Sequence, residues 1–278
     1  TVSLEYTAIT RGKERVEIRA RVKGFAMTKH VDGGKRVKAG DLIFTIDPRS
    51  FEAAVKEGEA EVATQRAALK LADVTLTRYR EAFASQAANQ QELDTATAQR
   101  DSAKAQLELA EAKLVQSKLD LEYTHVRSPI NGRLSLETID IGQLVGANDA
   151  TLMAFVIDDS IIYARYAMPE KTVLQLQKQY ANKRPGEDGR ANLKVMMAMP
   201  NETEFEHEGW FDKADNTVSP QTGTVDVEAA YENPDSTILP GLFVRVRPVL
   251  GEQDAMLVPD IAIGADQSGT VSYTHLTL

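Results

Sequence analysis

The sequence predicts an elongated α+β protein of several domains, and three observations lead to this prediction. A pattern of glycines and apolar residues occurs twice, at residues 24–47 and 132–158, which indicates one small β domain with an insert. The residues between the two copies have the periodicity of helices. After the second copy, short apolar runs alternate with turn signals, which is typical of strands. At 278 residues the chain has room for two to four domains of roughly 100–200 residues.

The two copies agree position by position when they are aligned on their first glycines, Gly24 and Gly132. Each copy closes on an Ile-Asp pair, at residues 46–47 and 157–158. Two such halves can pair into one flattened sandwich or barrel. The other matched positions are Val31 and Ile139, Asp32 and Asp140, Gly34 and Gly142, Val37 and Val145, and Asp41 and Asp149.

The first copy and the segment before it have the features of strands and tight turns. From Val16 to Lys23, apolar and charged residues alternate, and this period of two predicts a half-buried strand. Short apolar runs then alternate with glycines, as expected where hairpin turns need a positive φ. These glycines are Gly24, Gly33, Gly34 and Gly40.

Residues 49–128 contain no proline and one glycine, Gly58, and their apolar residues recur at intervals of seven. Sustained heptads predict a coiled coil. The pattern lapses at residues 85–89, where Asn89 is a suitable N-cap and Glu92 completes a capping box. We expect an antiparallel hairpin of two helices, each of about 33 residues and roughly 50 Å long. The heptad positions are Val55, Val62, Leu69, Leu76 and Phe83, then Leu93, Leu107, Leu114 and Leu121, with small companions at Ala96, Ala103, Ala110 and Ser117.

Beyond Asp158 the predicted elements are mostly strands. They lie at residues 161–168, 193–199, 225–231 and 242–249, with turn signals between them and a loop at 183–190. One helix is predicted from Pro169 to about Tyr180, because proline is tolerated in a first helical turn. Several short strands and one helix indicate a small β-barrel.

The split β domain resembles the biotinyl/lipoyl domain, and the resemblance spans both copies of the repeat. In carriers of that family, a lysine at a hairpin tip bears the prosthetic group. Here the helical insert occupies the corresponding place, after Asp47-Pro48. Lys35 and Lys38 lie in turn-rich sequence without the Met-Lys-Met context of the carriers, and we interpret them as solvated charges. The resemblance therefore implies a lipoyl-like fold without a carrier lysine.

Segments along almost the whole chain resemble, in order, the periplasmic adaptors of resistance–nodulation–division (RND) efflux pumps. These adaptors are also called membrane fusion proteins, and the resemblance is to their HlyD/AcrA/MexA-like members. The most extended segments are residues 218–225, 233–235 and 239–246. The others are residues 6–10 leading into 16–19, residues 121–124 with 126–129, and Val258-Pro259.

The resemblance implies four domains. The lipoyl-like domain would comprise residues 16–47 and 124–157, the helical hairpin residues 48–123, and the β-barrel residues 158–250. Residues 1–15 and 251–278 would form a membrane-proximal β domain. That domain is expected to be incomplete, because residues 274–278 do not continue the pattern of the family, and we expect a truncated or foreign tail.

The resemblance also implies partners and a cellular location. Relatives assemble as a hexameric ring in the periplasm, between an inner-membrane RND transporter and a TolC-like outer-membrane channel. They are attached to the inner membrane, and family members carry an N-terminal lipid-modified cysteine. This chain begins after any such residue, so the sequence neither supports nor excludes a lipid anchor. The turns at Gly33, Gly34 and Gly142 are expected to pack between neighbouring adaptors.

In relatives, the hairpin tip contacts the channel through an Arg, a Leu four residues later and a Ser seven residues beyond that. Arg78 matches the first, Ala82 stands at the Leu position with Phe83 beside it, and Asn89 stands at the Ser position. The channel contact is therefore expected at Arg78, Ala82, Phe83, Ser85, Gln86 and Asn89.

Composition and motifs point away from several other functions. The formal net charge of −9 argues against a nucleic-acid surface, which needs clustered Lys and Arg. The absence of cysteine excludes disulfides, thiolate metal sites and cysteine nucleophiles. The sequence has no GxxxxGK[ST] phosphate loop and no GxSxG elbow, so we expect neither an enzyme nor a cofactor.

Two groups of residues are candidates for metal or proton chemistry. Met196, Met197 and Met199 offer soft ligands, but strand core is the favoured interpretation. The histidines at positions 30, 125, 207 and 275 form no ligand set, so no metal site is predicted. His207 lies among glutamates at 204, 206 and 208, and would be a pH-sensitive hinge if it packed near a carboxylate; a solvated strand edge is the favoured alternative.

The leading hypothesis is therefore a non-catalytic periplasmic adaptor of a drug-exporting RND pump. The alternatives are an adaptor for an ABC transporter or a metal-efflux pump, and a biotinyl/lipoyl carrier component of an enzyme complex.

Overall fold

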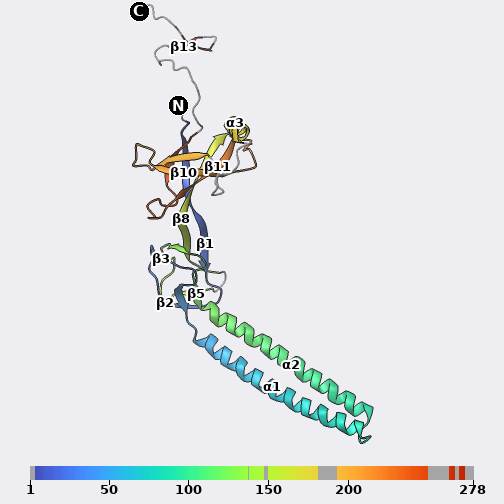
Figure 1. Cartoon of the computed structure of the whole chain (residues 1–278). Coiled ribbons are helices and arrows are strands. Elements are labelled where there is room, and N and C mark those ends of the chain that lie inside the picture. The colour runs from blue at the N-terminus through green and yellow to red at the C-terminus, as the bar shows by residue number, and fades with distance from the viewer. Residues whose placement is uncertain are drawn as a thin grey trace, which may run out of the picture. The chain divides into compact units, whose positions relative to one another are not determined.

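The chain forms two compact units, residues 14–158 and residues 1–13 together with 159–278. The computed structural model describes residues 4–136, 138–146, 150–180, 193–249, 263–266 and 269–272. Strands β1 (Tyr6–Arg19) and β8 (Leu152–Pro169) each run from one unit into the other (Figure 1). Each unit has its own buried apolar core, so each is described separately.

The unit of residues 14–158 contains two small antiparallel arrays of strands around one core. A four-stranded sheet has the order β5-β4-β2-β7, while β3 pairs with β6 and β6 pairs with β8. Side chains from both copies of the repeat fill the core, among them Ile43, Phe44, Leu134 and Val156. The strands are β2 (Gly24–Lys29), β3 (Arg36–Val37), β4 (Leu42–Ile46), β5 (His125–Arg127), β6 (Gly132–Leu134) and β7 (Leu144–Val145).

In the structure, each copy of the repeat pairs with the other copy in the same way. Gly24 in β2 lies opposite Val145 in β7, and its equivalent Gly132 in β6 lies opposite Val37 in β3, the equivalent of Val145. The backbone hydrogen bonds follow the same rule: the N–H groups at 26 and 134 donate to the carbonyls at 143 and 35, each at 2.9 Å. The prediction that the two copies form one β domain is confirmed by these pairings.

The glycines of the repeat are required for two different reasons. Gly34 and Gly142, at equivalent positions, have φ of +82° and +88°, as predicted for turn glycines. Gly24 and Gly33 were also predicted to be turn glycines with positive φ, but neither has one. At Gly24 the constraint is different. A Cβ there would lie 2.6 Å from Ile46 Cγ2, so space is the constraint. At Gly132 a Cβ would overlap the backbone carbonyl of Ile157.

The predicted hairpin consists of α1 (Arg49–Ala84) and α2 (Gln90–Tyr123), 36 and 34 residues long. The helices are antiparallel and lie side by side along their length, as Figure 1 shows. Ion pairs join them, between Arg66 and Glu111 at 3.2 Å and between Lys118 and Glu59 at 3.6 Å. The hairpin is inserted between β4 and β5, which are neighbours in the sheet.

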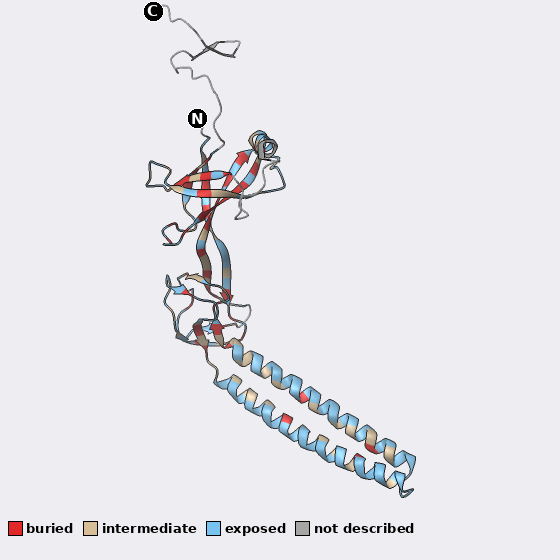
Figure 2. Cartoon of the chain, viewed as in Figure 1, coloured by how far each residue is buried: buried red, intermediate tan, exposed pale blue. Residues whose placement is uncertain are grey.

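Burial along the hairpin follows the predicted heptads. Val62, Leu76, Ala96 and Ala110 are buried, and the other predicted positions are half-buried except Phe83, which is exposed at the end of α1. Most of the remaining surface of both helices is exposed (Figure 2). Full burial of a Leu or Val side chain contributes about 1.5–3 kcal/mol to stability, so this narrow seam stabilises the helix pair. Most of the outer surface of both helices stays exposed to solvent.

The second unit contains a ring of antiparallel strands with one helix. The strand order is β1-β12-β9-β10-β11-β8, and β1 also pairs with β8. The core holds Tyr166, Tyr231, Met197 and Val246, so Met197 is a core residue, as the favoured interpretation held. The elements are β9 (Lys194–Ala198), β10 (His207–Ala214), β11 (Thr224–Glu232), β12 (Phe243–Pro248) and α3 (Glu170–Tyr180), with a separate pair β13 (Ile263–Asp266) and β14 (Gly269–Ser272).

The structure confirms the strands and the helix predicted in this region and adds β10, which was not predicted. It also places the start of the chain: Tyr6 lies opposite Val246 and Ile9 opposite Phe243. Residues 6–13 therefore lie in the barrel unit, although they were expected in a membrane-proximal domain with residues 251–278. Most of that second segment, with the predicted loop at 183–190 and the tail at 274–278, lies outside the described residues.

Candidate functional site: the hairpin tip

The tip of the hairpin is closed by two capping motifs that leave its side chains at the surface. At the end of α1, the Ala87 N–H donates to the Ala82 carbonyl at 2.8 Å and the Gln86 N–H donates to the Phe83 carbonyl at 3.0 Å. This is a Schellman motif, in which the residue after the cap takes a left-handed conformation. That residue is Gln86, with φ of +61°, where glycine is usual.

The start of α2 has the capping box that the sequence predicted. Asn89 Oδ1 accepts a hydrogen bond from the Glu92 N–H at 2.9 Å, and Glu92 Oε2 accepts one from the Asn89 N–H at 2.9 Å. Both motifs satisfy backbone groups that a helix end would otherwise leave unpaired. The tip is therefore held by its own backbone and caps, which frees the other side chains for contact with a partner.

The structure brings the predicted contact residues to the end of the hairpin, with Arg78 further back along α1. Phe83 is 40% exposed, and Tyr79, which the sequence analysis did not single out, is 37% exposed. The two aromatic residues are four apart on one helix and therefore neighbours on its surface, so this spacing could have predicted an aromatic pair near the tip. Arg78, Phe83, Ser85, Gln86 and Asn89 are exposed, and Ala82 is half-buried.

Chemically, the tip is suited to binding. Exposed aromatic surface gives contact area at low entropic cost, and the guanidinium and amide groups give directional hydrogen bonds. The conformation of the loop is set by hydrogen bonds within the chain, such as those of Ser85 Oγ to the carbonyls of Glu81 and Ala82 at 3.1 and 3.0 Å. A preformed loop loses little conformational freedom on binding.

The predicted turns at Gly34 and Gly142 occupy equivalent places in the sandwich but have different surroundings. Beside Gly142, four apolar side chains are 40–56% exposed: Phe25, Met27, Ile141 and Leu144. Phe25 and Leu144 lie directly opposite each other in the β2–β7 pair. Their equivalents in the other half are Arg133 and Arg36, also opposite each other. The repeat therefore has one apolar and one basic end. This difference was not predicted, because only positions with similar residues in both copies were matched.

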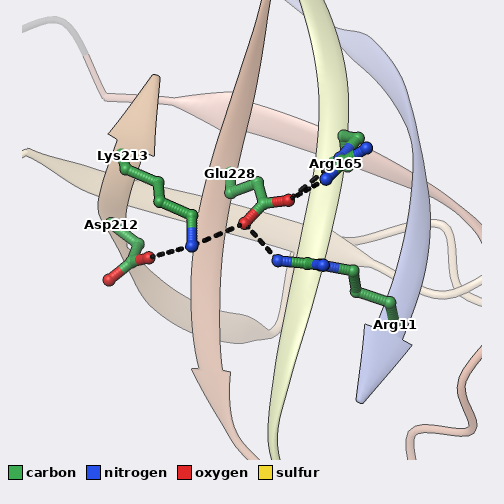
Figure 3. Close-up of polar contacts among 5 residues, drawn as sticks. All are labelled: Arg11, Arg165, Asp212, Lys213 and Glu228. Atoms are coloured by element: carbon green, nitrogen blue, oxygen red, sulfur yellow. Dashed lines mark hydrogen bonds and ion pairs between the residues drawn. The ribbon is translucent and has the colours of Figure 1, made fainter. Parts of the chain in front are cut away.

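The most highly charged centre of the barrel unit is around Glu228 on β11 (Figure 3). Its side chain is 5% exposed and accepts hydrogen bonds from Arg11 and Arg165, each at 2.7 Å, with Lys213 at 3.3 Å. Burial opposes ionisation, but the hydrogen bonds from Arg165 and Arg11 outweigh it and lower the pKa of Glu228. This arrangement ties β1, β8, β10 and β11 together, so we interpret it as structural.

His207, for which a pH-sensitive role was considered, packs against a carboxylate. Its Nε2 lies 3.1 Å from Glu202 Oε1, and both side chains are largely buried. Glu202 also accepts a hydrogen bond from the Met199 N–H at 2.8 Å. Burial raises the pKa of Glu202, but these two hydrogen bonds outweigh it and the pKa is lowered. The carboxylate partner, Glu202, lies in the turn before β10, so the acidic residues that flank His207 in the sequence did not predict this contact.

Within the described ranges, no three His, Asp or Glu side chains are grouped so that they could hold a metal ion. Of the helices in those ranges, none is both long enough and apolar enough to cross a bilayer.

Comparison with known families identifies two matching domains. The family model described as "RND MFP, barrel-sandwich hybrid domain", where MFP stands for membrane fusion protein, matches residues 14–157. The model described as "RND MFPs, beta-barrel domain" matches residues 161–252. The first match alone covers more than half of the chain and includes the hairpin tip.

Individual proteins give the same result. The multidrug efflux pump subunit AcrA of Escherichia coli K12 is 31% identical over 260 residues, which cover 93% of this chain and 65% of AcrA. The efflux pump periplasmic linker BepD of Brucella suis is 29% identical over 274 residues, 98% of this chain and 69% of BepD. This chain thus spans about 65% of the length of AcrA.

Solved structures share the fold. A MacA–MexA chimera with the α-hairpin domain of Pseudomonas aeruginosa MexA superposes with a TM-score of 0.64 at 20% identity, over 99% of this chain and 93% of the chimera. ZneB from Cupriavidus metallidurans superposes with a TM-score of 0.53 at 23% identity, over 89% of this chain and 98% of ZneB.

Proposed function

The chain belongs to the RND membrane fusion protein family, and from this we propose that it is the periplasmic adaptor of a tripartite efflux pump. The proposed role is to link an inner-membrane RND transporter to a TolC-like outer-membrane channel, for the export of drugs or other small molecules. The single observation that supports this most strongly is the hairpin: two helices of 36 and 34 residues, spliced between neighbouring strands, with exposed aromatic residues at their tip.

The proposed domain division follows from this assignment. We assign residues 16–47 and 124–157 to a lipoyl-like sandwich, residues 48–123 to the hairpin and residues 158–250 to the barrel. Residues 6–13 go with the barrel because β1 pairs with β12. The reciprocal pairing of the two halves supports the lipoyl-like assignment, and the helices replace the turn that would carry a prosthetic group.

The proposed work is mechanical. An adaptor must hold two partners together and must resist unfolding under load, which requires rigid elements with adhesive surfaces at their ends. The hairpin meets this requirement, because its seam is apolar, its flanking charges are paired across the helices and both ends of its loop are capped. In this proposal the exported molecule passes through the assembly and is not transformed by the adaptor.

Two surfaces are proposed for the partners. The tip residues Arg78, Ala82, Phe83, Ser85, Gln86 and Asn89 are proposed to contact the channel, with Tyr79 added by the structure. The turns at Gly33, Gly34 and Gly142 are proposed to pack between neighbouring adaptors in a hexameric ring, where the exposed apolar residues beside Gly142 would be covered. The protein would act in the periplasm, attached to the inner membrane.

Deletion of residues 82–88 tests the role of the tip. We expect the deletion to abolish drug efflux while the protein remains folded and at normal abundance, because these residues form only the end of α1 and its cap, and the hydrogen bonds of Ser85, Gln86 and Ala87 stay within the last turn of α1 and the loop. Efflux is measured as the minimal inhibitory concentration of pump substrates in a strain that lacks its own adaptor. Unchanged resistance in the deletion strain would contradict the assignment of the tip.

A matched pair of point variants separates the tip from general surface effects. Phe83 and Val218 are both 40% exposed, one at the tip and one in a turn of the barrel unit. Phe83→Ser should reduce resistance, and Val218→Ser should leave it unchanged. Equal loss in both variants would show that the assay reports adaptor stability and not channel contact.

A further inference from the structure

The heptad positions that form the seam of the hairpin contain one charged residue, Arg100. Its Nε lies 3.1 Å from Asp73 Oδ1 on α1, and its Nη1 lies 3.0 Å from Asp101 Oδ1 on α2. The other members of the same series on α2 are Leu93, Leu107, Leu114 and Leu121. Burial of apolar side chains at these positions holds a coiled coil together. The apolar seam is therefore interrupted at Arg100.

The ion pairs of Arg100 do not replace a buried leucine. The side chains of Arg100, Asp73 and Asp101 are 35%, 51% and 63% exposed. Ion pairs at this exposure contribute little to stability, because solvent screens them and both side chains must be held in place. A leucine buried at the same position would contribute more. The helices are therefore held together less firmly here than at the leucine positions.

A polar cavity of about 380 Å³ lies beside Arg100 and is lined by both helices. Its lining consists of Leu76 and six polar side chains: Asp73, Thr77, Arg80, Thr97, Arg100 and Asp101. A polar cavity of this size admits water. Water that enters the seam competes with the hydrogen bonds across it, which further loosens the contact between the helices.

Each helix is also weakened at this level by a pair of threonines. On α1, Thr75 and Thr77 each donate from Oγ1 to the carbonyl four residues earlier, at 2.9 Å. On α2, Thr95 and Thr97 do the same, at 2.7 and 2.8 Å. Threonine has a low helix propensity, and this hydrogen bond favours bending of the helix. Because Thr77 and Thr97 both line the cavity, the two pairs lie at one level of the hairpin.

Between this level and the loop, few contacts hold the helices together. On the side of the base, Val62 is buried and two ion pairs join the helices. On the side of the tip, Tyr79 and Phe83 are exposed, and Ala96 is the one buried side chain. In the part of the chain that the structure describes, the ion pair between the helices that lies nearest the loop is that of Arg100. Segments with few buried apolar contacts open at a lower free energy than a packed core.

We propose that the hairpin contains a joint, formed by residues 73–77 and 95–101, about which the tip segment of residues 78–94 moves as one unit. The rest of the hairpin, which we call the shaft, comprises residues 49–72 and 102–123. The joint lies between the shaft and the residues proposed to contact the channel, so it lets the tip adjust its orientation during docking. The joint itself is argued from contacts within the hairpin, whereas its use in docking rests on the proposed function.

Hydrogen exchange of the full-length protein tests the joint. We expect the amides of residues 79–93 to exchange as a group, at least about tenfold faster than amides in the middle of the shaft, because opening the tip exposes little apolar surface. The change in rate should be a step at the level of Arg100. A gradual rise toward the loop without such a step, or equal protection of tip and shaft, would overturn the proposal.

Substitution in the seam tests the cause. Arg100→Leu should slow exchange of the tip amides at least about tenfold, because leucine restores the apolar seam and the two residues have similar helix propensities. Lys104→Leu is the control, since it replaces a cation by leucine at an exposed position on the same helix and should leave the rates unchanged. Unchanged tip exchange in Arg100→Leu, or equal slowing in Lys104→Leu, would refute the role of Arg100.

A variant with the opposite effect complements this test. Leu107→Arg places a second arginine in the seam, one heptad nearer the base. It should extend the fast-exchanging group by about one heptad on each helix, while the rest of the shaft keeps its rates. A group of unchanged length in this variant would also count against the proposal.

The resistance assay tests whether docking uses the joint. In a strain that lacks its own adaptor, Arg100→Leu at normal abundance should lose resistance to pump substrates, and Lys104→Leu should keep it. Full resistance in an Arg100→Leu strain, with slowed exchange in the purified variant, would overturn the role of the joint in docking. Failure of the parent protein to restore resistance would refute the proposed function alone, since the exchange measurements test the joint without the pump.

Discussion

At Glu228, burial and the surrounding charges act on ionisation in opposite directions. Its carboxylate is almost fully buried, while its three cationic partners are 45–60% exposed. Removing the negative charge leaves the three cations facing one another without their common anion. Breaking a buried pair typically costs 3–5 kcal/mol, and exposure of the partners reduces that figure. We therefore expect Glu228→Gln to lower the free energy of unfolding by about 2 kcal/mol, as measured by urea titration.

The same carboxylate makes a pH dependence predictable. Since the pKa of Glu228 is lowered on folding, its ionisation stabilises the native state above the unfolded pKa of a glutamate, and this contribution is lost as pH falls through the folded pKa. The loss of stability between about pH 5 and pH 3 should be smaller in Glu228→Gln than in the parent. Asp212→Asn is the control, since the one ion pair of Asp212 within the described part of the chain is with Lys213, at 3.8 Å. An identical pH profile in Glu228→Gln and the parent would contradict the role of this group.

At the scale of elements, the two halves of the sandwich offer a matched pair of substitutions. A Cβ at Gly24 would meet the Cγ2 methyl group of Ile46, a single side-chain atom, whereas a Cβ at Gly132 would meet the backbone of Ile157 and Asp158, which can shift less. We expect Gly132→Ala to destabilise the unit by about 3 kcal/mol and Gly24→Ala by about 1 kcal/mol. Urea midpoints of the two variants measure the difference, and equal midpoints would disprove the asymmetry.

Elements whose pattern is local were predictable from the sequence. The heptads predicted the two helices and the residues of their seam. Asn89 and Glu92 predicted the start of α2, because a capping box depends on two residues only three positions apart. β10 was missed because its sequence, HEGWFDKA, does not alternate apolar and polar residues, and Gly209 is its one buried residue. The pairing of Tyr6 with Val246 was missed for another reason, since the two residues are far apart in the sequence.

The site was predictable only in part. Position along a helix located the tip residues, but the exposure of Tyr79 depends on where the packed seam ends. The charged cluster around Glu228 brings together residues 11, 165, 213 and 228. These residues are far apart in the sequence and follow no motif, so the cluster could not be predicted.

At the scale of the whole molecule, the pump class is open to a direct test. We expect an RND transporter to co-purify with the tagged full-length protein after cross-linking in its host and extraction in detergent. An ABC transporter or a metal pump in its place would assign it to another export system. The intact mass of the same preparation should show no biotinyl or lipoyl group on any lysine, because the helices replace the turn that bears such groups in carriers.

The insertion of the hairpin between β4 and β5 affects how the length of the hairpin can change in evolution. The two strands are neighbours, with Thr45 opposite His125, so both ends of the hairpin are anchored at one place whatever its length. Adding one heptad to each helix would extend the arm by about 10 Å and return every seam residue to the same face. The sandwich would be unaffected. Under the proposed function, the length of the arm could therefore change in evolution to match the distance between pump and channel, without any change in the sandwich.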